Sequence, residues 1–316
     1  MDARLTGLLA CTALMLGACA SQTPESAPGA DHPLAGQIFR MNDRVAVSQA
    51  ELVADAADAE FVLIGERRDN PEHQRLQAAL VAVLEAIGDR PRAVAFEMIP
   101  AERQLEIVEH LQGQTDAAGL GAAVGWDSTG WPDWRRYQPI AQAALDNDAQ
   151  IVAADLDAAE KEAAFTQGAQ AFRTPFVRRT GLAEPWPMPL MVSMQDELRA
   201  AQCGEAPAHE LIGMVRVERA RDAMMADRLA ATAGTGGGVL IAGNGHVRKD
   251  RGVPWYLARL RPGARSVSIG LLEVQDDARE PALGLPYDYV WYTVRVDDRG
   301  APCESDAGLE RVRQAG

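Results

Sequence analysis

Short, continuous apolar runs alternate along this chain with longer segments whose apolar residues recur every three or four positions. The short runs lack the strict alternation of a half-exposed strand, so they predict β-strands covered on both faces, as in a parallel sheet. The longer segments between them predict amphipathic helices. The predicted strands span residues 61–64, 93–96, 150–154, 238–242, 266–271 and 288–293.

The best-defined helix follows the first of these strands. Asn70 is a favourable N-cap, and Pro71 suits the first helical position because its φ is already fixed near the helical value. The apolar stripe that follows consists of Leu76, Leu80, Val83, Leu84 and Ile87, and Gly88 ends it. Two more helices are predicted at about 134–146 and 208–231. We therefore predict one α/β domain over residues 37–316, with a mostly parallel sheet, flanking helices and a largely helical insertion at about 157–232.

The charge composition argues against one class of binding partner. The chain has 316 residues, of which 47% are hydrophobic and 24% charged, and its formal net charge is −14. Neutralising the phosphates of a nucleic acid needs a basic face, so this balance argues against a nucleic-acid partner.

The N-terminus has the pattern of an export signal. Residues 5–18 carry no charge and are too few to span a bilayer, and the run ends in "LGACAS". This resembles a bacterial lipobox, which implies cleavage of residues 1–18 and attachment of lipid to Cys19; an ordinary signal with a chance cysteine is the alternative. Residues 19–36 then form a flexible tether rich in Pro, Ser, Gly and Ala. We expect a protein anchored through this lipid to a bacterial membrane on the periplasmic side, with Ala20 favouring the outer membrane.

The remaining cysteines fit an oxidising compartment. Cys11 leaves with the signal and Cys19 carries lipid, which leaves Cys203 and Cys303. Two thiols in such a compartment are more often bonded than free, so we predict a disulfide between them. There is no Cys-x-x-Cys-His motif for covalent haem attachment.

Polar residues follow the predicted strands. Glu66, Glu97 and Asp155 each come at the end of an apolar run, and Asn244 and His246 follow a fourth run. Because ligands of open α/β sheets bind at the carboxyl ends of the strands, we predict that these groups meet in one site. The "GNG" at 243–245 does not complete a dinucleotide fingerprint, and no P-loop is present, so we expect no nucleotide cofactor.

Two further patterns are ambiguous from sequence alone. Trp126, Trp131, Trp134 and Tyr137 crowd into one stretch, and most methionines fall between residues 188 and 225. Such clusters either pack in the core, which is the commoner case, or line a pocket for a flat apolar ligand. Arg221 lies on an apolar helical stripe, so it must pair with an acid or face a cleft.

Several motifs together resemble the ChaN family of iron-regulated, haem-binding bacterial lipoproteins. They are "GE-x-x-DNP-x-H-x-x-x-Q" from residue 65, "FE" at 96–97, "GWPDWRRYQPI" at 130–140, "RDAMMA" at 221–226, "LIAGNGHVRKDRGVP" at 240–254 and "YDYVWYT" at 287–293. The resemblance covers roughly residues 37–303 and implies a bound haem, with a homodimer left open. It also extends to a wider group of TIKI proteases and erythromycin-esterase-like hydrolases, which use two Gly-x-x-His motifs and an acidic strand end.

This chain departs from the family pattern at two positions. Arg68 stands where the first Gly-x-x-His would have its histidine, and Gln74 replaces a later one, whereas the second motif survives from Gly243 to His246. Arginine has no lone pair for a metal but pairs readily with carboxylates. The departure therefore weakens a hydrolase interpretation and favours binding of an anionic ligand such as haem, whose propionates Arg68 would meet.

Two functional hypotheses follow, and a third, plainer interpretation is a lipoprotein whose pocket has decayed. The first is a membrane-anchored protein that binds haem or a similar flat anionic iron complex for iron acquisition, with His246, His73 or a tyrosine as iron ligand. The second is a metal-dependent hydrolase that works through His246, Glu66 and Glu97; we favour a binding protein over an enzyme. We expect Arg68 to pair with Glu97 or Glu66. The predicted pocket residues are Glu66, Arg68, Asn70, His73, Glu97, Trp134, Tyr137, Arg221, Asn244 and His246.

Overall fold

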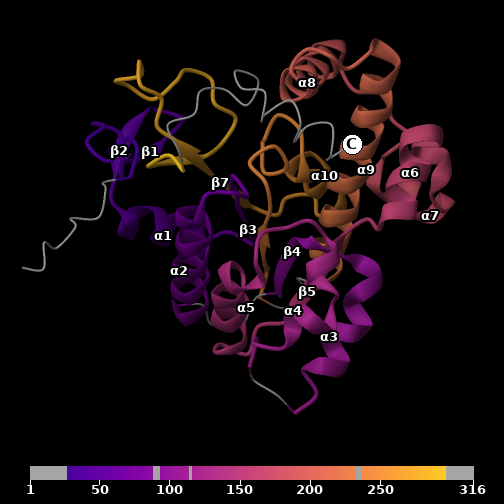
Figure 1. Ribbon diagram of the computed structural model, residues 1–316, viewed down its shortest axis with the longest axis horizontal. Helices are drawn as coiled ribbons and strands as arrows, with labels where there is room; N and C mark the ends of the chain where they lie inside the picture. The colour runs from indigo at the N-terminus through magenta and orange to yellow at the C-terminus, as the bar shows by residue number, and fades with distance from the viewer. Residues whose placement is uncertain (1–26, 88–92, 114–115, 233–235, 297–316) are drawn as a thin grey trace, which may run out of the picture.

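One mixed sheet with helices on both faces forms the fold (Figure 1). The computed structural model describes residues 27–87, 93–113, 116–232 and 236–296. The strand order is β2-β1-β8-β7-β3-β6-β4-β5, and all pairs from β8 to β5 are parallel. The strands are β1 (Ile38–Arg40), β2 (Val45–Val47), β3 (Phe61–Ile64), β4 (Ala93–Pro100), β5 (Ile151–Asp155), β6 (Gly238–Ile241), β7 (Ser266–Glu273) and β8 (Tyr289–Thr293).

The helices form two layers, one on each face of the sheet. Alternate residues of a strand point to opposite faces, so Val62 and Ile64 of β3 enter one core while Phe61 and Leu63 enter the other. The first core is covered by α1 (Gln49–Ala57), α2 (Pro71–Ile87), α3 (Gln104–His110), α4 (Leu120–Ala123) and α5 (Gln138–Leu145). The second is covered by α6 (Ala158–Gln167), α7 (Thr174–Thr180), α8 (Met188–Ala201), α9 (Ala208–Thr232) and α10 (Val253–Leu260).

The predicted α/β fold is confirmed, including a parallel central sheet and helices throughout 157–232. Short 3₁₀ helices connect several elements: η1 (Ala101–Arg103), η2 (Trp126–Ser128), η3 (Trp134–Arg136) and η4 (Gly168–Ala171). The helix predicted at 134–146 is therefore divided into η3 and α5. The strands β1 and β2 were not predicted; they pair antiparallel with each other, and β1 pairs antiparallel with β8, which makes the sheet mixed.

The part of the predicted tether that is described belongs to the fold. Leu34 is buried in the second core, and the amide of Gly36 donates to the carbonyl of Tyr292 at 2.9 Å. The packed domain therefore begins before residue 37, because the apolar Leu34 anchors this Pro- and Gly-containing segment. Cys19 lies outside the described residues.

The disulfide prediction can be checked for one of its two cysteines. Cys203, just after α8, is disulfide-bonded. Its predicted partner Cys303 lies outside the described residues, so the pairing stays a prediction. Among the described residues, no helix is both long enough and apolar enough to cross a membrane.

Candidate functional site

Four adjacent parallel strands bring ionisable side chains to the carboxyl edge of the sheet. Glu66 follows β3, Glu97 lies in β4, Asp155 ends β5, and His246 lies in the loop after β6. All four are at least nine-tenths buried. Burying such groups is costly unless they are paired, so their partners define what the edge can do.

The loop that carries His246 is fixed by tight backbone contacts. The amide of Val253 donates to the carbonyl of His246 at 2.8 Å. Gly252 makes this approach possible, because its φ is +75° and a Cβ there would lie 2.4 Å from the His246 carbonyl oxygen. At the start of the loop, the amide of Gly243 donates to Glu97 Oε2 at 2.6 Å. The loop after β6 is thereby tied to β4.

Arg221 of α9 is the centre of this edge. Its Nη2 lies 2.6 Å from Glu97 Oε1 and 2.9 Å from Asp155 Oδ2, and its Nη1 lies 3.4 Å from Glu218 Oε2. Its Nε donates to Asp155 Oδ1 at 3.0 Å, and only 13% of its side chain is exposed. One guanidinium thus cross-links two strand ends and a helix.

His246 is held on both ring nitrogens. Nδ1 lies 2.7 Å from Asp222 Oδ1, and Nε2 lies 3.0 Å from Arg221 Nη1. Burial works to lower the pKa of His246, but the carboxylates of Glu97 and Asp222 outweigh it, and the pKa lies well above its usual value. The Nε2 nitrogen of His246 is therefore either protonated or directed at the guanidinium of Arg221. In neither case does it offer a free lone pair to a metal.

The pKa values of two carboxylates in this network are shifted in opposite directions. Burial works to raise the pKa of Glu97, yet the charges of His246 and Arg221 hold it below its usual range. Burial raises the pKa of Asp222 to about 6, with His246 acting in the opposite sense. Asp222 and Glu218 were not predicted from the sequence. For Glu218 the available signal was its spacing, three residues before Arg221 on the same helix, whereas Asp222 directly follows Arg221 and had no such signal.

Glu66 belongs to a separate cluster on the other side of the sheet edge. Its Oε1 accepts from the hydroxyl of Tyr137 at 2.7 Å, and its Oε2 accepts from Gln74 Nε2 at 2.8 Å. Burial raises the pKa of Glu66 to about 7, although both donors favour the charged form. Burial, followed by the charge of Glu66, also places the pKa of Tyr137 well above its usual value. Glu66 therefore contacts the α2 and α5 layer, whereas His246 contacts α9.

Three of the predicted pocket residues stabilise the fold instead. His73 is fully buried; its Nδ1 accepts from the Arg67 amide at 2.7 Å and its Nε2 lies 2.8 Å from Thr293 Oγ1. Asn70 caps α2 by accepting from the amide of Glu72 at 3.0 Å. The side chain of Asn244 pairs with the backbone of Leu271 in β7, donating at 2.6 Å and accepting at 3.1 Å.

The aromatic cluster is mostly core. Trp126, Trp134 and Tyr137 are buried, with ring centroids of Trp126 and Trp134 4.8 Å apart. Trp134 donates its Nε1–H to the carbonyl of Ala117 at 3.1 Å and packs in the first core. Trp131 alone is partly exposed. Of the two interpretations of this cluster, core packing holds for three of its four members.

Arg68 does not make the predicted ion pair with Glu97 or Glu66. It is exposed, and its guanidinium carbon lies 5.6 Å from the ring centroid of Trp131. Glu97 is paired with Arg221, and Glu66 is bonded to neutral donors. The reason is positional: the strand-end carboxylates are buried, whereas Arg68 is exposed beside Trp131.

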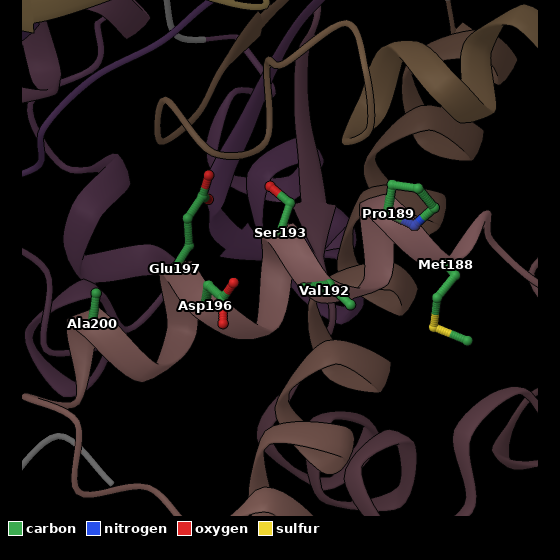
Figure 2. Close-up of a pocket in the computed structure, with 7 residues that line it drawn as sticks. All are labelled: Met188, Pro189, Val192, Ser193, Asp196, Glu197 and Ala200. Carbon is green, nitrogen blue, oxygen red and sulfur yellow. The ribbon is translucent and has the colours of Figure 1, made fainter.

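A separate cavity of about 870 Å³ lies along α8 (Figure 2). Met188, Pro189 and Val192 give it an apolar character, and none of the predicted pocket residues line it. Its closest link to the sheet edge is Glu197, which pairs with Arg248 at 2.9 Å and with Arg251. A cavity of this volume is within the range of small-molecule sites, roughly 300–1,000 Å³.

The donor set of the edge does not suit a metal ion. Over the described ranges, no group of three or more His, Cys, Asp and Glu side chains is arranged to hold one. At the strand ends the place between the carboxylates is taken by the guanidinium of Arg221. The predicted iron ligands also do not fit as they stand: His73 and His246 use both ring nitrogens, and all five tyrosines are buried.

The fold and this edge define an α/β protein whose strand ends meet in a closed ionic network. A family model described as haem-binding uptake, Tiki superfamily, ChaN matches residues 52–257. The chain therefore belongs to the ChaN family of the Tiki superfamily. None of the curated proteins matches it.

The similarity to one solved structure supports the fold. The chain is 19% identical to the structure described as cofacial haem binding to ChaN of Campylobacter jejuni, with a TM-score of 0.65, covering 80% of this chain and 95% of the other. The type III effector HopBA1 is 15% identical, with a TM-score of 0.42 and coverage of 77% and 91%. An erythromycin esterase mutant in its open conformation is 16% identical, with a TM-score of 0.41 and coverage of 79% and 80%.

Proposed function

We propose that this protein binds haem, or a similarly flat dicarboxylate iron complex, as its cargo. The observation that carries the proposal is the match of residues 52–257 to a family of haem-binding uptake proteins. The fold supports it through its similarity to the structure of cofacial haem binding to ChaN of Campylobacter jejuni.

The described side chains favour recognition of the ligand by its periphery over iron ligation by the predicted residues. His246 would have to lose Arg221 and a proton before its Nε2 became a ligand, and His73 would have to leave a fully buried position. Exposed features are of another kind: an arginine stacked near Trp131 and an apolar cavity along α8. Such features recognise carboxylates and flat apolar surfaces.

The cellular part of the proposal rests on the N-terminal sequence. A lipid on Cys19 would anchor the protein to a bacterial membrane on the periplasmic side, in keeping with a role in iron acquisition. We propose a binding protein and not a metal-dependent hydrolase, because Arg221 takes the place between the strand-end carboxylates.

Titration of the purified mature protein with haemin tests the proposal. We expect saturable quenching of tryptophan fluorescence together with a change in the Soret band. His246→Ala should leave the dissociation constant within about threefold of the wild-type value, a difference of roughly 0.7 kcal/mol. Absence of saturable binding by the wild-type protein would refute haem as the cargo, and loss of binding in His246→Ala would restore the ligand role of that histidine.

A further inference from the structure

Two loops at the carboxyl edge bring four arginines together. Arg67 and Arg68 follow β3, and Arg135 and Arg136 lie in η3 and precede α5. The loops touch, because Arg136 Nη1 donates to the backbone carbonyl of Asp69 at 3.3 Å. A chain with a formal net charge of −14 therefore presents a local concentration of positive charge beside its strand ends.

Only two of these arginines have carboxylate partners. Arg67 pairs with Asp69 at 2.8 Å and also with Glu273. Arg135 pairs with Asp133 at 2.6 Å. Each exposed aspartate of the two loops is thus taken by the arginine nearest to it.

Arg68 and Arg136 make no close ion pair with a carboxylate among the residues that the structure describes. Both are exposed. The Arg68 guanidinium is placed by the ring of Trp131 at 5.6 Å, and that of Arg136 by the carbonyl of Asp69. Stacking on an aromatic ring and bonding to a carbonyl both leave N–H donors of a guanidinium available, so the two groups can still receive anions.

Trp131 provides a firm, partly exposed aromatic surface beside them. Its ring centroid lies 6.3 Å from that of Tyr137 at an interplanar angle of 78°. Tyr137 in turn is buried and donates to Glu66. The ring is therefore supported from the core side by a side chain that is itself fixed.

We propose that Arg68 and Arg136 bind the two propionate carboxylates of haem, with the ring of Trp131 against the macrocycle. This inference rests on the proposed function and names its recognition site. Guanidinium groups suit carboxylates because they offer paired N–H donors in a plane. The excess negative charge elsewhere on the chain disfavours a dianion at other surfaces, which helps to select this one.

Haemin titrations of four proteins test the site: the wild type, Arg68→Ala, Arg136→Ala and the double variant. Arg135→Ala is the matched control, since this neighbouring arginine is 85% exposed in its side chain and already paired with Asp133. Haemin dimethyl ester, which lacks the two negative charges, is the control ligand. Circular dichroism of each variant checks that it is folded, and Arg68→Lys tests whether charge without the planar fork suffices.

We expect each alanine substitution to raise the haemin dissociation constant about tenfold, and the double variant to lose most of the preference for haemin over its ester. Arg135→Ala should bind as the wild type does. Wild-type affinity in the double variant, or equal affinity of the wild type for haemin and its ester, would overturn the site. Val192→Glu probes the α8 cavity; if it alone abolishes binding, the ligand lies there instead. If the wild type binds no haemin at all, the proposed function itself fails.

Discussion

Replacing Arg221 by methionine removes the cation that holds the carboxyl edge together. Methionine keeps the length of the side chain and a good helix propensity, so the change in α9 is mainly one of charge. In the wild type the guanidinium lies 2.6 Å from Glu97 and 2.9 Å from Asp155. Without it, Glu97 retains the amide of Gly243 and the more distant His246, while Asp155 retains Lys161 at 2.7 Å.

The expected loss follows from how deeply these groups are buried. Glu97 is 5% exposed in its side chain and Asp155 3%. Removing one partner of a buried ion pair costs about 3–5 kcal/mol. Because Lys161 still neutralises Asp155, we expect the lower end, a decrease of about 3 kcal/mol in the free energy of unfolding.

Urea unfolding at pH 7, followed by circular dichroism and extrapolated linearly, measures this loss. Arg216→Met is the matched control: Arg216 lies on the same helix, is exposed, and donates to the backbone carbonyls of Phe165 and Thr166. The control should lose less than about 1 kcal/mol. Adding Glu97→Gln to Arg221→Met should recover part of the loss, since the unpaired charge is then gone. A loss in Arg221→Met no larger than in the control would refute the reasoning.

The same network should also affect how the free energy of unfolding changes at acid pH. The pKa of Glu97 lies below its usual range in the folded protein, so its contribution to stability is present above the unfolded-state pKa of 4.5 and is lost as the pH falls. Arg221 is one of the charges that lower this pKa. The Arg221→Met variant should therefore lose less stability than the wild type between pH 5 and about pH 3.

Four further predictions concern single features. Burial raises the pKa of Glu66 from 4.5 to about 7, so wild-type stability should fall as the pH rises from 4.5 to 7, by up to about 3 kcal/mol, and Glu66→Gln should abolish this dependence in urea unfolding. Metal-free protoporphyrin IX should bind within about tenfold of haemin, and a complete requirement for iron would contradict peripheral recognition. Cys19→Ala should release the protein from membranes; unchanged fractionation would count against the anchor. The unreduced, denatured protein should yield no alkylatable thiol from Cys203 or Cys303, and two labelled thiols would exclude their disulfide.

The fold could be predicted from the sequence because its signals are local. The strand Phe61–Ile64 is an uninterrupted apolar run, and Asn70 and Pro71 mark the start of the next helix. The strands β1 and β2 were missed because each has three residues and because they form by antiparallel pairing: β2 pairs with β1, and β1 pairs with β8, which lies some 250 residues away in sequence. Pairing over that separation leaves no periodic pattern to read.

The sequence could predict which residues lie at the strand ends, but not the contacts that their side chains make. The convergence of Glu97 and His246 follows from sheet topology, whereas the direction in which each side chain leaves the edge does not. His73 illustrates the difference, since its place near the site is real but its ring nitrogens are used by Arg67 and Thr293. Thr293 belongs to the distant strand β8, so no local spacing could have indicated that contact.

Two arginines of the carboxyl edge, Arg221 and Arg68, differ in what they contact. Arg221 is buried and satisfies acids that an open metal site would need, so the surviving Gly-x-x-His motif around His246 is a structural contact here. Arg68 is exposed beside Trp131 and makes no ion pair with these buried acids, so in the proposed function it would be a cation available to an anionic ligand. A histidine at position 68 would be neutral for most of the time at pH 7 and would offer no second guanidinium beside Arg136. In the proposed function, an arginine at position 68 therefore suits recognition of a dianion better than coordination of a metal.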